Sequence, residues 1–156
     1  MKKICGLSLL CTLFISFSFF EAKGQTSPTV TAALPVTYPW TNDQLIGPSD
    51  LAGQIDKGIA PIIFNIGAVE DIKGAKHIGP VSNAANMQKF RAAVVSLPKN
   101  TPLVIYCGCC PFTKCPNIQP AFNELKSSGF TNVKVLDLKT NLKTDWIARG
   151  YPYVAD

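Results

Sequence analysis

The chain has 156 residues, of which 15 are Lys or Arg and 10 are Asp or Glu, so its formal net charge is +5. This length favours a single globular domain, and a hydrophobic fraction of 47% is enough for a real core. The basic residues are not gathered into runs, which argues against nucleic acid as the main partner.

The first 24 residues have the features of a secretory signal peptide. Met1-Lys2-Lys3 is a basic head, residues 4–20 are apolar apart from Gly, Ser and Thr, and small residues stand at 22 and 24. We therefore predict cleavage after Gly24 and a secreted or periplasmic protein that has no membrane association once the signal is removed. An uncleaved membrane anchor is the alternative, although the apolar segment is short for a membrane span.

Cleavage would remove three lysines, one glutamate, Cys5 and Cys11, leaving twelve basic and nine acidic residues and a net charge of +3. Four cysteines would remain in an oxidising compartment, where disulfides can persist. Residues 25–43 are rich in Thr, Pro and Ala without any period, so we predict an extended lead-in to one domain over residues 44–156.

Strands are predicted where short apolar runs lie between turn residues, and helices where apolar residues recur every three or four positions. The predicted strands cover residues 44–46, 61–67, 74–80, 102–106 and 133–136. The predicted helices cover 50–57 with Ser49 as N-cap, 83–97, a segment from near Pro116 to 127, and 141–149. Because strands alternate with helices, the sequence predicts an α/β fold with a mostly parallel sheet.

The stretch from Cys107 to Cys115 holds four of the six cysteines. It joins the carboxyl end of the predicted strand 102–106 to a helix that we expect to begin near Pro116, with Cys115 at or near its N-cap. A start at Pro120 is the alternative. Open α/β sheets place their chemistry in such strand-to-helix loops, and the N–H groups of a helix N-terminus favour a thiolate.

Four segments of the chain resemble the rhodanese family of sulfurtransferases, and together they span residues 44–153. In chain order they are the helix 50–57 with the strand 62–66, the turn Ile72-Lys73-Gly74-Ala75-Lys76-His77-Ile78, the strand end Leu103-Val104-Ile105-Tyr106-Cys107, and Gly129 to Leu136 with Trp146 and Gly150-Tyr151-Pro152. The loop pattern C-G-C-C-P-x-x-x-C-P resembles a cysteine-rich secreted branch of that family.

The resemblance implies a three-layer fold of about five mostly parallel strands flanked by helices, without a bound cofactor. It also implies that Cys107 is a catalytic cysteine that carries sulfane sulfur as a persulfide, and that the partner is a small sulfur-containing donor or a partner-protein thiol. The sequence departs from the family at Asn65 and Gly67, where the family usually has Asp and Arg, and in its longer loop without arginine.

The loop supports this chemistry with further residues of the right type. Cys109, Cys110 and Cys115 are candidate resolving or redox thiols, and Lys114 is a candidate stabiliser of a thiolate or of an anionic donor. His77, the single histidine, is expected to be structural.

Three other interpretations of the loop remain open. Cys107 and Cys110 form a C-x-x-C pair suited to thiol–disulfide exchange, and pairings of either cysteine with Cys115 are equally allowed. The four thiols could instead bind Cu(I) or Zn, although their spacing is not a standard zinc pattern. Finally, disulfides could lock the loop of a non-catalytic binding domain.

Overall fold

The computed structural model describes residues 40–155. The predicted signal peptide with Cys5 and Cys11, and the lead-in up to residue 39, lie outside the described residues. Within the described residues, no helix is both long enough and apolar enough to cross a membrane.

A single parallel sheet of five strands runs through the described part of the chain, in the order β1-β5-β4-β2-β3. The strands are β1 (Leu45–Ile46), β2 (Ile62–Asn65), β3 (Lys76–His77), β4 (Leu103–Tyr106) and β5 (Val133–Leu136). All four residues of the central strand β4 are buried, which is why its sequence is continuously apolar instead of alternating. The predicted α/β fold with about five mostly parallel strands is confirmed.

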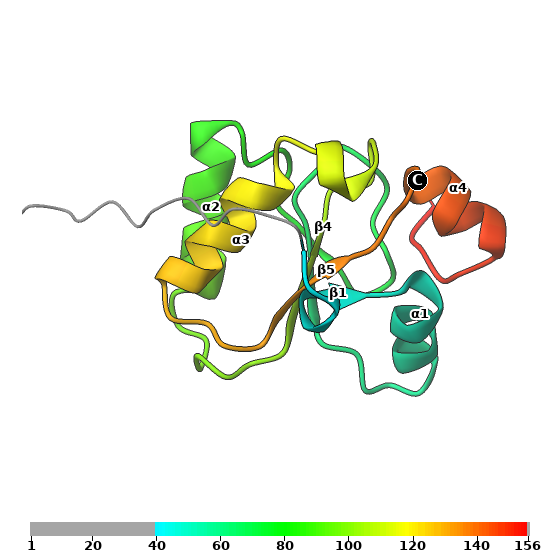
Figure 1. Cartoon of the computed structure of the whole chain (residues 1–156), viewed down its shortest axis with the longest axis horizontal. Helices are drawn as coiled ribbons and strands as arrows, with labels where there is room; N and C mark the ends of the chain where they lie inside the picture. Colours follow the sequence, from blue (N-terminus) through cyan, green and yellow to red (C-terminus); the bar gives the residue numbers. More distant parts are fainter. Residues whose placement is uncertain (1–39, 156) are drawn as a thin grey trace, which may run out of the picture. The chain divides into compact units, whose positions relative to one another are not determined.

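Helices cover both faces of this sheet (Figure 1). The α-helices are α1 (Pro48–Asp56), α2 (Ala84–Val94), α3 (Ile118–Ser127) and α4 (Leu142–Asp145), and the 3-10 helices are η1 (Asn42–Gln44), η2 (Phe112–Lys114) and η3 (Ile147–Arg149). Helices α2 and α3 pack on one face, while α1 and α4 pack on the other, so the described domain has three layers.

Each face of the sheet has its own hydrophobic core. On the α2 and α3 side, the ring of Phe90 meets the ring of Phe64 edge-on, with centroids 5.4 Å apart. On the α1 and α4 side, Trp146 is fully buried and donates its ring N–H to the carbonyl of Pro152 (3.0 Å).

Two predicted helix starts were wrong by two residues each. Helix α1 begins at Pro48 with Gly47 as N-cap, because proline has a helical φ and needs no N–H at the first helical position. Helix α3 begins at Ile118 with Asn117 as N-cap, and not near Pro116. Pro120 therefore stands in the first turn, where its missing N–H would have had no acceptor within the helix.

The predicted helix 141–149 is divided into two short helices. Asn141 caps α4 by accepting a hydrogen bond from the N–H of Thr144 (2.8 Å), and Trp146 then leaves the helical conformation. Helix η3 follows and ends at Gly150, whose φ of 73° is left-handed.

Candidate functional site

The cysteine loop leaves β4 after Tyr106 and lies at the carboxyl edge of the sheet (Figure 1, yellow). The loop passes so close to the segment after β2 that position 67 must be glycine, since a Cβ there would overlap the carbonyl of Cys107. The sequence has Gly67 there. Gly108 has a φ of 78°, and a Cβ there would lie 2.8 Å from Val69.

Hydrogen bonds and aromatic contacts hold the loop in place. The N–H of Phe112 donates to the carbonyl of Leu138 (3.0 Å), and the N–H of Leu142 donates to the carbonyl of Gly108 (2.8 Å). Trp40 packs its ring against that of Phe112, at a centroid distance of 6.1 Å. The loop is thus tied to the segment that follows β5 as well as to its own neighbours.

Three cysteine sulfurs come together at the base of the loop. The Sγ atoms of Cys107, Cys109 and Cys115 all lie within 4.8 Å of one another, and we call these three residues the thiol triad. Cys107 and Cys109 have their sulfurs 3.4 Å apart, and Cys110 lies beside the triad with its Sγ 3.4 Å from that of Cys109. All four are free thiols, and no disulfide joins them in this structure.

Asn117 is a site residue that sequence reasoning missed. Its Nδ2 donates to the sulfur of Cys107 (3.3 Å), while its Oδ1 accepts the N–H of Ser82 (2.8 Å). The side chain is buried, with 5% of the residue exposed, so both bonds hold the amide in one orientation. The sequence offered one indication of this role: Asn117 stands between Cys115 and the first apolar residue of the helix.

Two cysteines of the triad have pKa values shifted in opposite directions. The pKa of Cys115 is lowered, because its sulfur accepts a hydrogen bond from the Cys107 thiol and further bonds from the backbone N–H groups of Asn117 and Ile118. The pKa of Cys107 is raised, because its thiol donates to Cys115 and because it is buried. The lowered pKa in the triad is therefore at Cys115, and not at Cys107, which the resemblance implies to be the catalytic cysteine.

The four thiols also differ in access to solvent. Cys107 is 2% exposed and Cys115 is 7% exposed, whereas Cys109 lies at the surface and Cys110 is partly buried. Desolvation is the main cause that raises the pKa of Cys109 and of Cys110. Cys109 is thus the triad member that solutes reach first.

The remaining candidate residues lie apart from the sulfurs. Lys114 is exposed on η2, and in the part of the chain that the structure describes it forms no ion pair or hydrogen bond with a cysteine. His77 lies on β3, as expected, with its Nδ1 3.0 Å from Asp71 Oδ1. Its place in that pair fits the expected structural role.

A hydrogen-bonded turn after β2 packs beside the cysteine loop. Asn65 is fully buried; its Nδ2 donates to Asp71 Oδ1 (2.8 Å), and its Oδ1 accepts the N–H of Gly67 (3.0 Å). From β4, the hydroxyl of Tyr106 accepts the N–H of Ile72 (2.9 Å) and donates to the carbonyl of Glu70 (3.1 Å). Residues 67–72 are therefore fixed against the strand that delivers Cys107.

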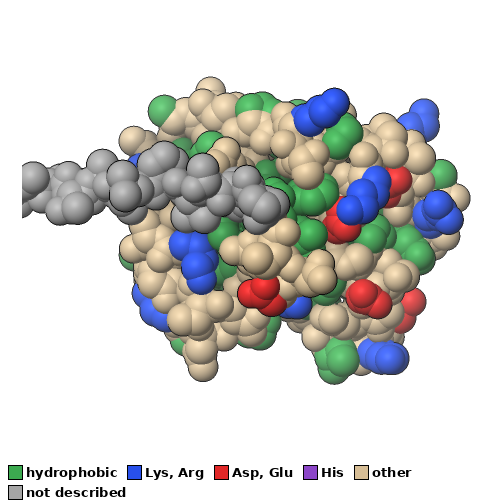
Figure 2. Space-filling view, viewed as in Figure 1, with side chains coloured by type: hydrophobic (Ala, Val, Ile, Leu, Met, Phe, Trp, Pro, Cys, Tyr) green, Lys and Arg blue, Asp and Glu red, His purple; other side chains and the backbone are tan. Residues whose placement is uncertain are grey.

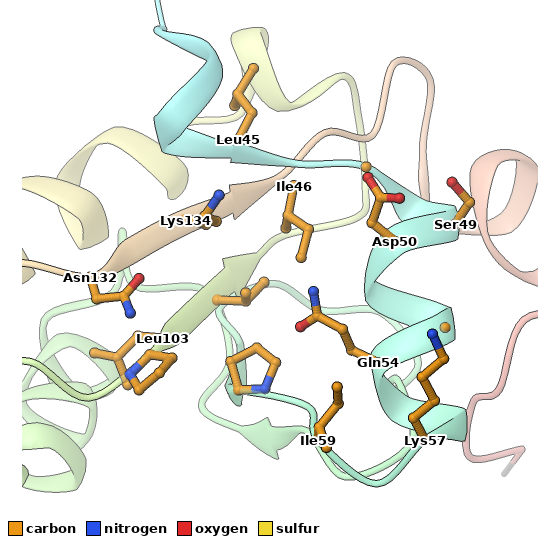
Figure 3. A pocket seen from close by; sticks show the side chains of 15 residues that line it. Leu45, Ile46, Ser49, Asp50, Gln54, Lys57, Ile59, Leu103, Asn132 and Lys134 are labelled. Carbon is orange, nitrogen blue, oxygen red and sulfur yellow. The ribbon is translucent and has the colours of Figure 1, made fainter.

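A separate cavity of about 670 Å³ lies between α1, β1 and the beginnings of β4 and β5 (Figure 3). Asp50 and Gln54 of α1 and Lys134 of β5 are among its lining residues, and no cysteine is among them. On the face drawn in Figure 2, basic and acidic side chains are interspersed. The cavity is therefore separate from the thiol triad, where three cysteine sulfurs lie close together.

No protein-family model matches the chain, and no curated protein sequence does either. Among solved structures, the chain is similar to the crystal structure of the Alr3790 protein from Anabaena sp., a Northeast Structural Genomics Consortium target, with a TM-score of 0.53. The two sequences are 22% identical, and the match covers 70% of this chain and 91% of that chain. At this identity the likeness shows a shared fold, the three-layer α/β arrangement described above.

Proposed function

We propose that this protein handles sulfane sulfur by carrying it as a persulfide on Cys107 and passing it to a neighbouring thiol. The observation that carries the proposal is the thiol triad, in which the Sγ atoms of Cys109 and Cys115 lie within 4.8 Å of that of Cys107. Its place at the carboxyl end of the central strand, and the resemblance of the sequence to rhodaneses, support the same reaction class.

Activation of Cys107 begins with a proton that two sulfurs share. Cys115 is the better anion of the pair and accepts the hydrogen bond of the resting Cys107 thiol, so it is placed to take the Cys107 proton as Cys107 attacks the donor. The transfer alone is uphill, and the new S–S bond draws it forward. The Cys107 thiolate that results keeps the hydrogen bond from Asn117 Nδ2, which favours the anion. A buried thiol of raised pKa can thereby become a nucleophile.

The loading step uses a donor with a sulfane sulfur, such as thiosulfate. The Cys107 thiolate attacks the outer sulfur of thiosulfate, a new S–S bond forms on Cys107, and the S–S bond of the donor breaks. The bonding electron pair leaves with sulfite, and Cys107 is left as a persulfide anion. No external oxidant or reductant is needed for this step.

Discharge has two routes that differ in which sulfur is attacked. If the Cys109 thiolate attacks the outer sulfur, the sulfur moves to Cys109 and Cys107 regains its thiolate. If Cys109 attacks the inner sulfur, hydrosulfide leaves with the electron pair and a Cys107–Cys109 disulfide forms. The second route oxidises the two cysteines, so an external thiol must then reduce them.

The test is the intact mass of the reduced protein after exposure to thiosulfate, with and without a reductant before measurement. We expect a gain of one sulfur atom that reductant removes, that is lost in Cys107→Ser and that remains in Cys110→Ser. Formation of thiocyanate from thiosulfate and cyanide should follow the same pattern. A gain of sulfur that persists in Cys107→Ser would contradict the role of Cys107.

Thiol–disulfide exchange is the second candidate, because the sulfurs of Cys107 and Cys109 are only 3.4 Å apart. It predicts that thiosulfate leaves the mass of the reduced protein unchanged. A small disulfide such as oxidised glutathione, which is reduced in the exchange, should instead remove two hydrogens for each protein disulfide formed. A non-catalytic domain would show neither turnover nor a change of mass that depends on Cys107.

A further inference from the structure

We propose that the thiol triad is also a binding site for one Cu(I) ion, with Cys107, Cys109 and Cys115 as its three ligands. This site does not depend on sulfur transfer. It rests on the distances between the sulfurs, on the hydrogen bonds around them and on the number of thiols that meet there.

The sulfur positions already suit a metal ion. For a metal–sulfur bond of about 2.3 Å, three sulfurs around a trigonal ion lie about 4.0 Å apart. The triad sulfurs lie within 4.8 Å of one another, and those of Cys107 and Cys109 are 3.4 Å apart. Changes of up to about 0.8 Å in the sulfur–sulfur distances, within the reach of cysteine side-chain rotation, bring all three to the ligand distance.

Hydrogen-bond donors lie around two of the three sulfurs and can stabilise their thiolate forms. The backbone N–H groups of Asn117 and Ile118 donate to Cys115, and the Nδ2 of Asn117 donates to Cys107. These donors compensate negative charge on the sulfurs at the N-terminus of α3. They also orient two of the three ligands, as outer hydrogen bonds do at metal sites.

The number and type of ligands select the ion. Among residues 40–155, the thiol triad is the group of Cys, His, Asp or Glu side chains close enough together to share a metal, and it contains sulfur alone. Soft thiolates favour Cu(I), whereas structural zinc sites draw on four ligands. Cys110, the fourth thiol of the loop, lies outside the triad, so a three-coordinate Cu(I) ion fits better than Zn.

The experiment is a Cu(I) titration of the reduced full chain without oxygen, in competition with the chelator bicinchoninate. Cys5 and Cys11 are replaced by serine in every sample, so that only the loop thiols remain. We expect one Cu(I) per chain and, by X-ray absorption, three sulfur neighbours at about 2.3 Å.

Single cysteine variants then identify the ligands. Cys107→Ser, Cys109→Ser and Cys115→Ser should each weaken Cu(I) binding more than about a hundredfold, since losing an outer partner alone weakens metal binding by about 10- to 100-fold. Cys110→Ser is the matched control, because it also removes one loop thiol, and it should leave the affinity within about threefold. Equal losses in all four variants, or no Cu(I) retained against the chelator, would overturn the proposal.

A second measurement leaves the loop cysteines unchanged, so its result cannot come from misfolding of a loop variant. Cu(I) added before iodoacetamide should protect Cys107, Cys109 and Cys115 from alkylation and leave Cys110 reactive, as read from peptide masses. Alkylation of the triad at an unchanged rate would also overturn the site. Neither readout requires sulfur transfer, so failure of the copper site and failure of the proposed function are told apart.

Discussion

The hydrogen bond between the sulfurs of Cys107 and Cys115 shifts the pKa values of both thiols. Cys115 accepts hydrogen bonds from the Cys107 thiol and from the N–H groups of Asn117 and Ile118, so it is the better anion of the pair. Cys107 is the more buried sulfur and keeps the proton. The pair therefore works as one unit in which either sulfur changes the acidity of the other.

Thiolate absorbance at 240 nm tests this pair directly. The wild-type protein should show one thiolate that forms below the usual thiol pKa of about 8.5. Cys115→Ser should remove that step, and Cys107→Ala should raise its pKa, because the thiol that donates to Cys115 is lost. Cys110→Ser should leave it unchanged. A low step that survives in Cys115→Ser would assign the thiolate to another cysteine.

Gly67 is the residue on which the position of Cys107 depends. A Cβ at this position would overlap the Cys107 carbonyl, so Gly67→Ala should lower the free energy of unfolding by at least about 3 kcal/mol. Gly53→Ala in α1 is the control, since a Cβ there has nothing within 4 Å; it should stabilise the protein by about 0.5–1 kcal/mol. Urea denaturation measures both, and equal stabilities of the two variants would contradict the close approach.

At the scale of elements, the end of β4 contacts two loops: the turn after β2 and the cysteine loop. Tyr106 holds the turn after β2 through its hydroxyl, and the next residue, Cys107, enters the thiol triad. Burial raises the pKa of Tyr106, which keeps the hydroxyl protonated and able to donate to the carbonyl of Glu70.

Tyr106→Phe removes both of these hydrogen bonds and leaves the ring in place. The N–H of Ile72 would remain buried without an acceptor, so the unfolding free energy should fall by about 1–3 kcal/mol. Hydrogen exchange at the Ile72 amide should become faster. Tyr153→Phe is the control on a partly exposed tyrosine and should change stability by less than about 0.5 kcal/mol. An Ile72 amide that exchanges at the wild-type rate would show that the hydroxyl does not hold the turn.

At the scale of the whole molecule, the sheet order places the reactive loop at its centre. Strand β4 lies between β5 and β2, so the loop that follows it is flanked by the ends of both neighbours. The loop is bonded to Leu138 and Leu142 beyond β5, and Gly67 beyond β2 runs beside it. The loop conformation that assembles the thiol triad is thus supported by β4 and by the segments that follow both of its neighbours.

The opposed pKa shifts make the stability of the whole protein depend on pH in a defined way. Because the pKa of Cys115 is lower in the folded state, its contribution is present above the unfolded thiol pKa of about 8.5 and is lost as pH falls through the folded value. Because the pKa of Cys107 is raised, its contribution is present below about 8.5 and is lost as pH rises further.

We therefore expect the stability advantage of the wild type over Cys115→Ser to grow between pH 7 and 8.5, by at most about 1.4 kcal/mol per pH unit. The advantage over Cys107→Ser should instead shrink above pH 9. Urea denaturation across this pH range measures both differences. Two differences that do not change with pH would show that neither thiol changes its pKa on folding.

The sequence by itself determined the α/β class, the parallel sheet and the loop that carries the reactive groups. Burial leaves local patterns in the sequence that can be recognised without the structure. Examples are the apolar run Leu103–Tyr106 and the helical spacing of Ile118, Ala121, Phe122 and Leu125. The start of α3 at Ile118 and the break at Trp146 escaped prediction, because caps and packing decide helix ends to within a residue or two.

Only the tertiary structure decided which thiols meet. The sequence allowed any pairing among the four cysteines, and the fold brings Cys107, Cys109 and Cys115 together while Cys110 stays beside them. It also lowers the pKa of Cys115 and raises that of Cys107, and it places Asn117 at the site. The physical reason is that hydrogen bonds and burial set the acidity of a sulfur. The donors are close in sequence, but their orientation and burial depend on packing against distant segments, such as Ser82, which holds Asn117.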